Sequence, residues 1–133
     1  MIKITSLIDE NGNVLKNLVS DMGDNNVKSL AELLSRRTDN KAKKPIEKNQ
    51  LRKFYDSFLK VYNNRSSDDS KKIQLLMLKA QAEYSEKRLS ISDFKDFFSN
   101  RIELVVKSDG ETFRNNLNAL KLHFEALVGY FPK

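Results

Sequence analysis

Apolar residues recur at helical spacing through most of the chain, most clearly between residues 47 and 63. Six apolar residues there fall at i, i+3, i+4, i+7, i+8 and i+11, which places them on one face of an α-helix. Arg52, Asp56 and Lys60 fall on the other face at four-residue steps. The apolar stripe consists of Leu51, Phe54, Tyr55, Phe58, Leu59 and Tyr62. The pattern predicts an amphipathic helix over residues 47–63.

Three further helices are predicted after it. A polar loop over residues 63–70 leads into a helix that runs to about residue 86 and is apolar on more than one side, which is typical of a central helix. The next helix opens near Ser92. Ser108 and Glu111 have the spacing of a capping box at the start of the last helix, whose apolar residues recur at steps of four and three up to Phe131. Short loops between these helices favour antiparallel packing in a bundle.

The first part of the chain is less regular. The pair Asn11-Gly12 favours a small hairpin, and the apolar residues between Val14 and Met22 suit a short helix, so both interpretations stay open. A helix is predicted over residues 27–37 and a polar loop over residues 38–45. The fold class is therefore all-α, a small bundle of four to five main helices. We expect a variable N-terminal segment over residues 1–44, with a short helix and a basic loop, and the bundle over residues 45–133.

Length and composition fit one domain of 133 residues. The chain contains no cysteine, which excludes disulfides and thiolate metal sites. No apolar run approaches the roughly 18 residues of a membrane span, and no signal-peptide pattern opens the sequence. We expect a cytoplasmic protein without membrane contact.

The net charge of +6 is unevenly distributed. Residues 36–60 contain nine Lys or Arg against three Asp or Glu, which equals the whole excess. Concentrated positive charge attracts polyanions such as nucleic acid. A solvated basic linker is an equally plain interpretation of the same stretch.

Catalytic chemistry has little support in the sequence. His123 is the only histidine and lies among apolar positions, where an edge packing residue is the simplest interpretation. The four glycines are isolated, so no glycine-rich phosphate loop is present. Acidic pairs such as Asp68-Asp69 lie at predicted helix starts, where capping explains them. We expect no enzymatic activity, no cofactor and no metal site.

The candidate binding residues are cations. Most aromatic residues lie on apolar stripes, so we expect them in the core, and nucleic acid would be bound through its phosphates with little base preference. Lys48, Arg52 and Lys53 cluster at the start of one predicted helix, and Lys79 interrupts an apolar helix surface. A salt bridge from Arg52 to Asp56 is the alternative for that residue. The full set also includes Arg88, expected in the turn after the same helix as Lys79, and Lys41, Lys43 and Lys44 of the basic loop.

Three segments resemble the small subunit of the type III-A CRISPR effector (Csm) complex: NQLRKFYDSF (49–58), LLMLKAQAEYSEKR (75–88) and FEALVGYFPK (124–133). Their order and spacing extend the likeness over about residues 47–133. The resemblance implies a subunit without catalytic activity that holds single-stranded target RNA, or its duplex with the CRISPR RNA. It also implies contacts with other Csm subunits and with copies of itself, in a filament or as a swapped dimer when free.

On matching positions, the resemblance implies that Arg52, Lys79 and Arg88 contact phosphates. Lys48 and Lys53 are added from helix geometry, and Lys41, Lys43 and Lys44 from the loop. Two other classes remain as alternatives. One is a helical protein-interaction adaptor without a nucleic-acid role. The other is a small helical DNA-binding regulator, although no helix pair has a helix-turn-helix signature.

Overall fold

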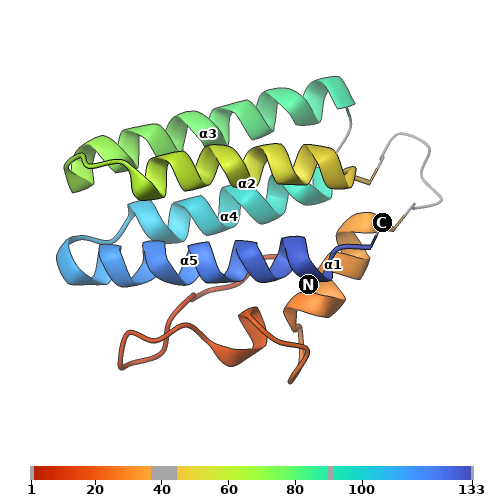
Figure 1. Cartoon of the computed structure of the whole chain (residues 1–133), viewed down its shortest axis with the longest axis horizontal. Coiled ribbons are helices and arrows are strands. Elements are labelled where there is room, and N and C mark those ends of the chain that lie inside the picture. Colours follow the sequence, from red (N-terminus) through yellow and green to blue (C-terminus); the bar gives the residue numbers. More distant parts are fainter. Residues whose placement is uncertain (1, 37–44, 90–91, 133) are drawn as a thin grey trace.

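The computed structural model describes residues 2–36, 45–89 and 92–132, with the side chains of residues 86–89 and 92 left undescribed. The described residues form five α-helices and one short 3₁₀-helix, which confirms the all-α prediction (Figure 1). The elements are η1 (Lys16–Leu18), α1 (Val27–Ser35), α2 (Lys48–Asn63), α3 (Asp68–Leu89), α4 (Ser92–Val106) and α5 (Gly110–Tyr130).

Local hydrogen bonds explain where two of the helices begin. The Asn26 side chain accepts a bond from the backbone N–H of Ser29 at 2.9 Å and caps α1. Glu47 and Gln50 form a reciprocal capping box at the start of α2, with the Glu47 N–H donating to Gln50 Oε1 at 2.9 Å. The Glu47 and Gln50 side chains thus each satisfy one backbone donor that water would otherwise have to bind.

The capping box predicted from Ser108 and Glu111 is wrong. The N-cap of α5 is Asp109, and its side chain makes no capping bond. Ser108 Oγ donates instead to the Val105 carbonyl at 2.8 Å, and accepts a bond from Asn116 Nδ2 at 3.1 Å. The hydroxyl therefore closes the preceding helix rather than opening the next.

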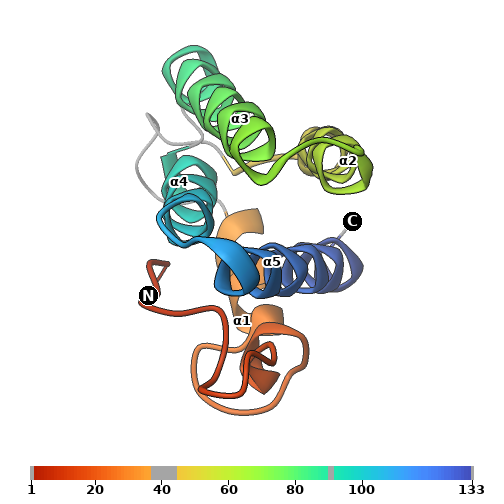
Figure 2. The same ribbon diagram turned by 90° about the vertical axis from the view of Figure 1, so that its left-hand side faces the viewer.

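α5 is the central helix. It packs against α1, α2, α4 and η1, whereas α3 packs against α4 and α2 (Figure 2). The interpretation of α3 as a central helix is therefore wrong. Leu75, Leu78 and Ala82 are its buried inner face, and its second apolar side is exposed. Apolar residues on two sides of a helix do not by themselves show that both sides are covered.

Phenylalanine rings fill the space between α2, α4 and α5. Phe54 of α2 packs on Phe94 of α4 with ring centroids 4.9 Å apart, and Phe97 meets Phe124 of α5 edge-on at 5.9 Å. Phe94, Phe97, Phe98 and Phe124 are all buried. These contacts confirm the assignment of these rings to the core, because rings packed on each other cannot stack on bases.

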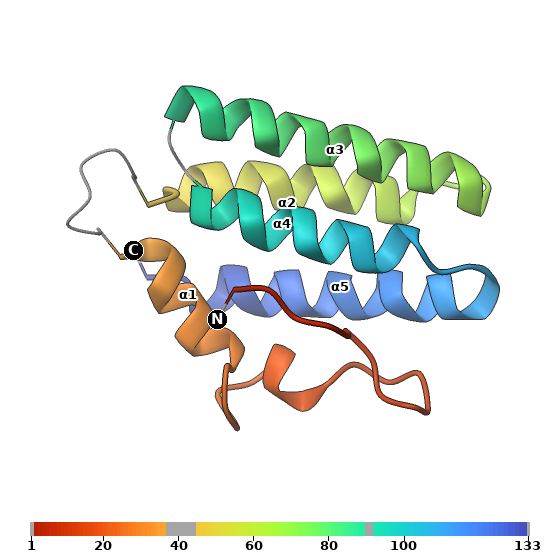
Figure 3. The same ribbon diagram turned by 180° about the vertical axis from the view of Figure 1, so that it is seen from behind.

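Residues 2–18 lie along α4 and α5 and belong to the same core (Figure 3). Ile8 and Val14 form an isolated antiparallel bridge around the turn at Gly12, whose φ is +83°, and η1 follows. Both interpretations of this region thus describe part of it, a tight turn and a single helical turn. Asn100 of α4 holds the segment by accepting from the Ile4 N–H and donating to the Ile4 carbonyl, both at 3.0 Å. The division of the chain between residues 44 and 45 stays a prediction.

Candidate nucleic-acid interface

The exposed side of α2 carries three cations. Because Leu51, Phe58 and Val61 face the core, Arg52, Lys53 and Lys60 are turned to solvent. Arg52 and Lys60 are eight positions apart, which is about 12 Å along the helix axis. We call Arg52, Lys53 and Lys60 the α2 basic strip.

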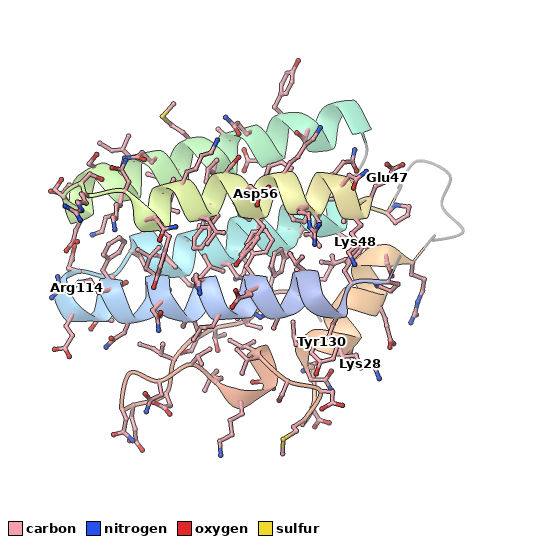
Figure 4. The ribbon with its side chains drawn as sticks, in the orientation of Figure 1. Lys28, Glu47, Lys48, Asp56, Arg114 and Tyr130 are labelled. Carbon is pink, nitrogen blue, oxygen red and sulfur yellow. The ribbon has the colours of Figure 1, made fainter. Side chains whose placement is uncertain are left out.

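The described part of the chain offers the α2 basic strip no ion-pair partner. The alternative predicted for Arg52, a bridge to Asp56, is not among the ion pairs of the described residues. Asp56 is itself exposed near the middle of the helix (Figure 4). Lys60 is not among the predicted phosphate contacts, although its four-residue spacing from Asp56 indicated the same exposed face. The charged groups of Arg52, Lys53 and Lys60 are therefore exposed to water, where a polyanion can reach them.

Lys48 has a different environment. Its Nζ donates to the backbone carbonyl of Phe131 at 3.3 Å, and the residue is half-buried. The amino end of α2, where Figure 4 labels Lys48, is thereby tied to the chain that follows α5. Lys48 has a structural contact in addition to any contact with a ligand.

Lys79 lies on the α3–α4 side of the molecule. Its Nζ pairs with Glu103 of α4 at 3.0 Å, and α2 packs against α3 on another side (Figure 2). The structure therefore does not bring Lys79 and Arg52 together in one groove. Arg88 belongs to the last turn of α3, since the helix continues to Leu89 rather than ending near Glu86. The Arg88 side chain and all of Lys41, Lys43 and Lys44 lie outside the described residues.

Arg101 and His123 form a buried polar pair between α4 and α5. Arg101 is 2% exposed and His123 is fully buried. Arg101 Nε donates to His123 Nε2 at 3.3 Å, which assigns the imidazole proton to Nδ1, where it can be donated to the Leu18 carbonyl at 2.7 Å. Arg101 also donates to the Ile2 carbonyl and lies over the Phe97 ring, 4.6 Å from its centroid.

Both groups are held in definite charge states. Burial, and then the adjacent Arg101 charge, lower the pKa of His123 to about 3, so the imidazole is neutral at pH 7. Burial lowers the pKa of Arg101 to about 9, which leaves it charged. His123 is thus a core residue and not an edge residue as predicted. Arg101 was missed, although it follows Phe97 by four residues and Phe98 by three, the spacing of the buried face.

Tyr55 and Glu125 form a hydrogen bond between α2 and α5. The Tyr55 hydroxyl donates to Glu125 Oε1 at 3.3 Å, and Lys121 Nζ lies 3.7 Å from Oε2 of the same carboxylate. Burial, and then the Glu125 charge, raise the pKa of Tyr55 to about 12.

Within residues 2–36, 45–89 and 92–132, no cluster of three or more metal-ligating side chains occurs. No described helix is long and apolar enough to cross a membrane.

These features define a class, a small basic helical bundle with buried aromatic residues and solvent-exposed cations on one helix. The family model described as Csm2 Type III-A matches residues 24–132. The match covers most of the chain, so the chain belongs to the Csm2 family, the small subunit of the type III-A CRISPR effector complex. The family match begins at residue 24, just before α1, so it starts earlier in the chain than the resemblance predicted over residues 47–133. Comparison with curated proteins and with solved structures gave no match.

Proposed function

We propose that this subunit holds the sugar-phosphate backbone of single-stranded target RNA through the α2 basic strip while the RNA pairs with the CRISPR RNA. Membership of the Csm2 family carries the proposal, because it associates the chain with an RNA-guided complex. The exposed cations of α2 then supply the chemistry that such a role requires.

The arrangement supports contacts with phosphates rather than with bases. Arg52, Lys53 and Lys60 lie along one helix, and cations in a row can follow a strand without reading its sequence. The aromatic rings of α2 that could stack on bases are packed instead on Phe94 and Phe124. In a guided complex, base pairing with the guide reads the sequence, so the protein needs only backbone contacts.

We infer that the subunit is non-catalytic. His123 is buried, neutral and hydrogen-bonded to Arg101 and Leu18, so it is unavailable to a substrate. Several copies of the chain along the complex, in contact with the larger subunits, would extend the basic strip into a continuous path for RNA. Lys41, Lys43, Lys44 and Arg88 remain proposed phosphate contacts, Lys48 is proposed at the end of the strip, and Lys79 would have to leave Glu103 to join it.

Binding of the purified chain to unstructured RNA of mixed sequence, measured by fluorescence anisotropy over a range of salt concentrations, tests the proposal. Replacing Arg52, Lys53 and Lys60 with Ala should flatten the log–log salt slope by about 2, from about 0.7 per phosphate contact. Affinity should fall alike for all sequences, because no base is read.

The matched control replaces Lys3, Lys16 and Lys107, three exposed lysines away from α2, with Ala. This variant loses the same charge and should keep the parent slope to within about 0.7, one phosphate contact. Equal weakening by both triple variants would mean that only net charge attracts RNA. The absence of binding at low salt would favour the protein-interaction adaptor.

A further inference from the structure

Two side-chain hydrogen bonds join α2 and α5 along the surface line where these helices meet. The Tyr62 hydroxyl donates to Asn118 Oδ1 at 3.0 Å, and the Tyr55 hydroxyl donates to Glu125 Oε1 at 3.3 Å. The later residue of α2 bonds to the earlier residue of α5, because the two helices run side by side in opposite directions (Figure 1). We call Tyr55, Tyr62, Asn118 and Glu125 the α2–α5 seam.

The Tyr62–Asn118 pair has both an acceptor and a donor left over. Its hydrogen bond uses the single proton of the Tyr62 hydroxyl and leaves the lone pairs of that oxygen without a donor among the described residues. Asn118 is exposed, and its Nδ2 group makes no hydrogen bond within the described part of the chain. A free acceptor and a free donor therefore lie side by side at the surface, and a ligand hydroxyl group can bond to both with one oxygen atom.

The Tyr55–Glu125 pair is less suited to such a ligand. Glu125 carries a negative charge, which repels phosphates, and Lys121 Nζ compensates it only at 3.7 Å. The Tyr62–Asn118 pair is neutral, so a nucleic-acid strand can lie against it without this repulsion. A hydroxyl site on the seam is therefore expected at Tyr62 and Asn118.

Cations flank the neutral pair along α5. Arg114 precedes Asn118 by four residues and Lys121 follows it by three, so the three side chains share one face of the helix over about 10.5 Å. Figure 4 labels Arg114 near the start of α5. Arg114 lies 3.2 Å from Asp68 and Lys121 lies 3.7 Å from Glu125. Ion pairs at the surface are weak, so a phosphate can replace either carboxylate.

This order of groups matches the repeat of an RNA strand. Each ribose lies between two phosphates, and its 2′-hydroxyl both donates and accepts hydrogen bonds. On α5 the hydroxyl site likewise lies between two cations. Deoxyribose lacks this hydroxyl, so DNA would leave the spare groups of Tyr62 and Asn118 without partners. The arrangement is complementary to RNA.

The seam borders the α2 basic strip. Arg52, Tyr55 and Tyr62 fall at i, i+3 and i+10, so the arginine lies on the edge of α2 that is turned towards α5. Lys53 and Lys60 lie further round the exposed side of the same helix. A strand held by Arg52 can therefore also contact the seam.

We propose that Tyr62 and Asn118 together bind a ribose 2′-hydroxyl of the target strand, with Arg114 and Lys121 on the flanking phosphates, and so select RNA over DNA. The inference rests on the proposed function and deepens it, because the α2 basic strip holds phosphates that RNA and DNA share. The strip supplies affinity, and the seam distinguishes the sugar.

Binding of the purified chain to short labelled oligonucleotides of uridine, deoxyuridine and 2′-fluorouridine, measured by fluorescence anisotropy, tests the proposal. All three have the same base and the same phosphates. The parent chain should bind the uridine strand roughly fivefold more tightly than the deoxyuridine strand, the effect of about one net hydrogen bond. The 2′-fluoro strand keeps the sugar pucker of RNA without a donor, so it should bind like the deoxyuridine strand.

Tyr62→Phe and Asn118→Ala each remove one half of the hydroxyl site. The Phe ring can keep its place beside Phe58, 6.3 Å between centroids, and an alanine at exposed position 118 favours the helix. Both variants should bind the uridine strand as weakly as the deoxyuridine strand, with the parent salt slope. Tyr55→Phe is the matched control, since it makes the same change on the same seam, and it should keep the parent ratio of the two affinities.

Replacing Arg114 and Lys121 with Ala separates charge from sugar recognition. This variant should flatten the salt slope by about 1.4 for both polymers, from about 0.7 per phosphate contact, because both strands carry the same phosphates. An unchanged slope would remove the two cations from the proposed site.

The outcomes distinguish this proposal from the proposed function. Equal affinity of the parent for uridine and deoxyuridine strands would overturn the hydroxyl site and leave the α2 basic strip in place. Binding of the 2′-fluoro strand as tightly as RNA would also overturn it, because strand shape would then be recognised. If Tyr62→Phe and Asn118→Ala weakened both polymers alike, the pair would only join the helices. Absence of binding to every strand at low salt would overturn both proposals.

Discussion

The stability of this protein should fall in mildly acidic solution because of one residue. His123 has a pKa of about 3 in the folded protein and about 6.5 in the unfolded chain, so the unfolded chain binds a proton first as the pH falls. Between the two pKa values the unfolded chain binds more protons than the folded protein, so the free energy of unfolding decreases as the pH falls through this range. The stabilisation is complete above pH 6.5 and is progressively lost down to about pH 3.

The magnitude follows from the size of the shift. Each pH unit below 6.5 costs about 1.4 kcal/mol, so lowering the pH from 7.5 to 5 should reduce the free energy of unfolding by about 2 kcal/mol. The physical reason is the contact with Arg101. A proton on His123 Nε2 would face the N–H that Arg101 donates to this atom, and both charges would be buried.

Urea unfolding followed by circular dichroism at pH 7.5, 6.5, 5.8 and 5 would measure the change. Few other groups change protonation between pH 7.5 and 5, because His123 is the only histidine and carboxylates titrate mostly below pH 5. His123→Gln should be less stable at pH 7.5 but should lose less than about 0.5 kcal/mol across the same window. A parent protein whose stability is flat from pH 7.5 to 5, or a variant with the parent slope, would refute the reasoning.

Two further predictions concern stability at neutral pH. Phe124→Ala should lower the free energy of unfolding by about 3–5 kcal/mol, because the ring is fully buried against Phe97 and its neighbours; a loss below about 1 kcal/mol in denaturant unfolding would contradict the packing. Gly12→Ala should cost about 1–2 kcal/mol, because φ is +83° and a Cβ would lie 2.6 Å from Asn115 Nδ2. Gly129→Ala, with open space around it in α5, should instead stabilise by about 0.5–1 kcal/mol, and the same sign for both glycine variants would show that φ does not govern the difference.

The helices were predictable because periodicity is a local property. The stripe from Leu51 to Tyr62 predicted α2 almost to its ends, since burial on one side requires that spacing. The position of α3 was not predictable in the same way. Ile73 and Met77 have the composition of a buried face, and only the three-dimensional arrangement shows that both side chains are exposed among the described residues.

The candidate site was predictable in part for the same reason. Arg52 and Lys53 face solvent because their helix turns its apolar side inward, which the sequence indicates directly. The partner of Lys79 comes from another helix, 24 positions along the chain, and no spacing rule within α3 can indicate Glu103. Arg101 and His123 illustrate the same limit, because a polar pair across two helices depends on tertiary contact.

The long sequence separation of the contacts that hold residues 2–18 has a consequence for synthesis. Ile4 is held by Asn100, and the Leu18 carbonyl by His123, so the segment leaves the ribosome about a hundred residues before its partners. At about 5–20 residues per second, Ile2, Ile4 and Leu7 would wait about 5–20 s in water. During that interval the nascent chain exposes an apolar segment that chaperones can bind. Docking of this segment should be a late step of folding, after α4 and α5 have met.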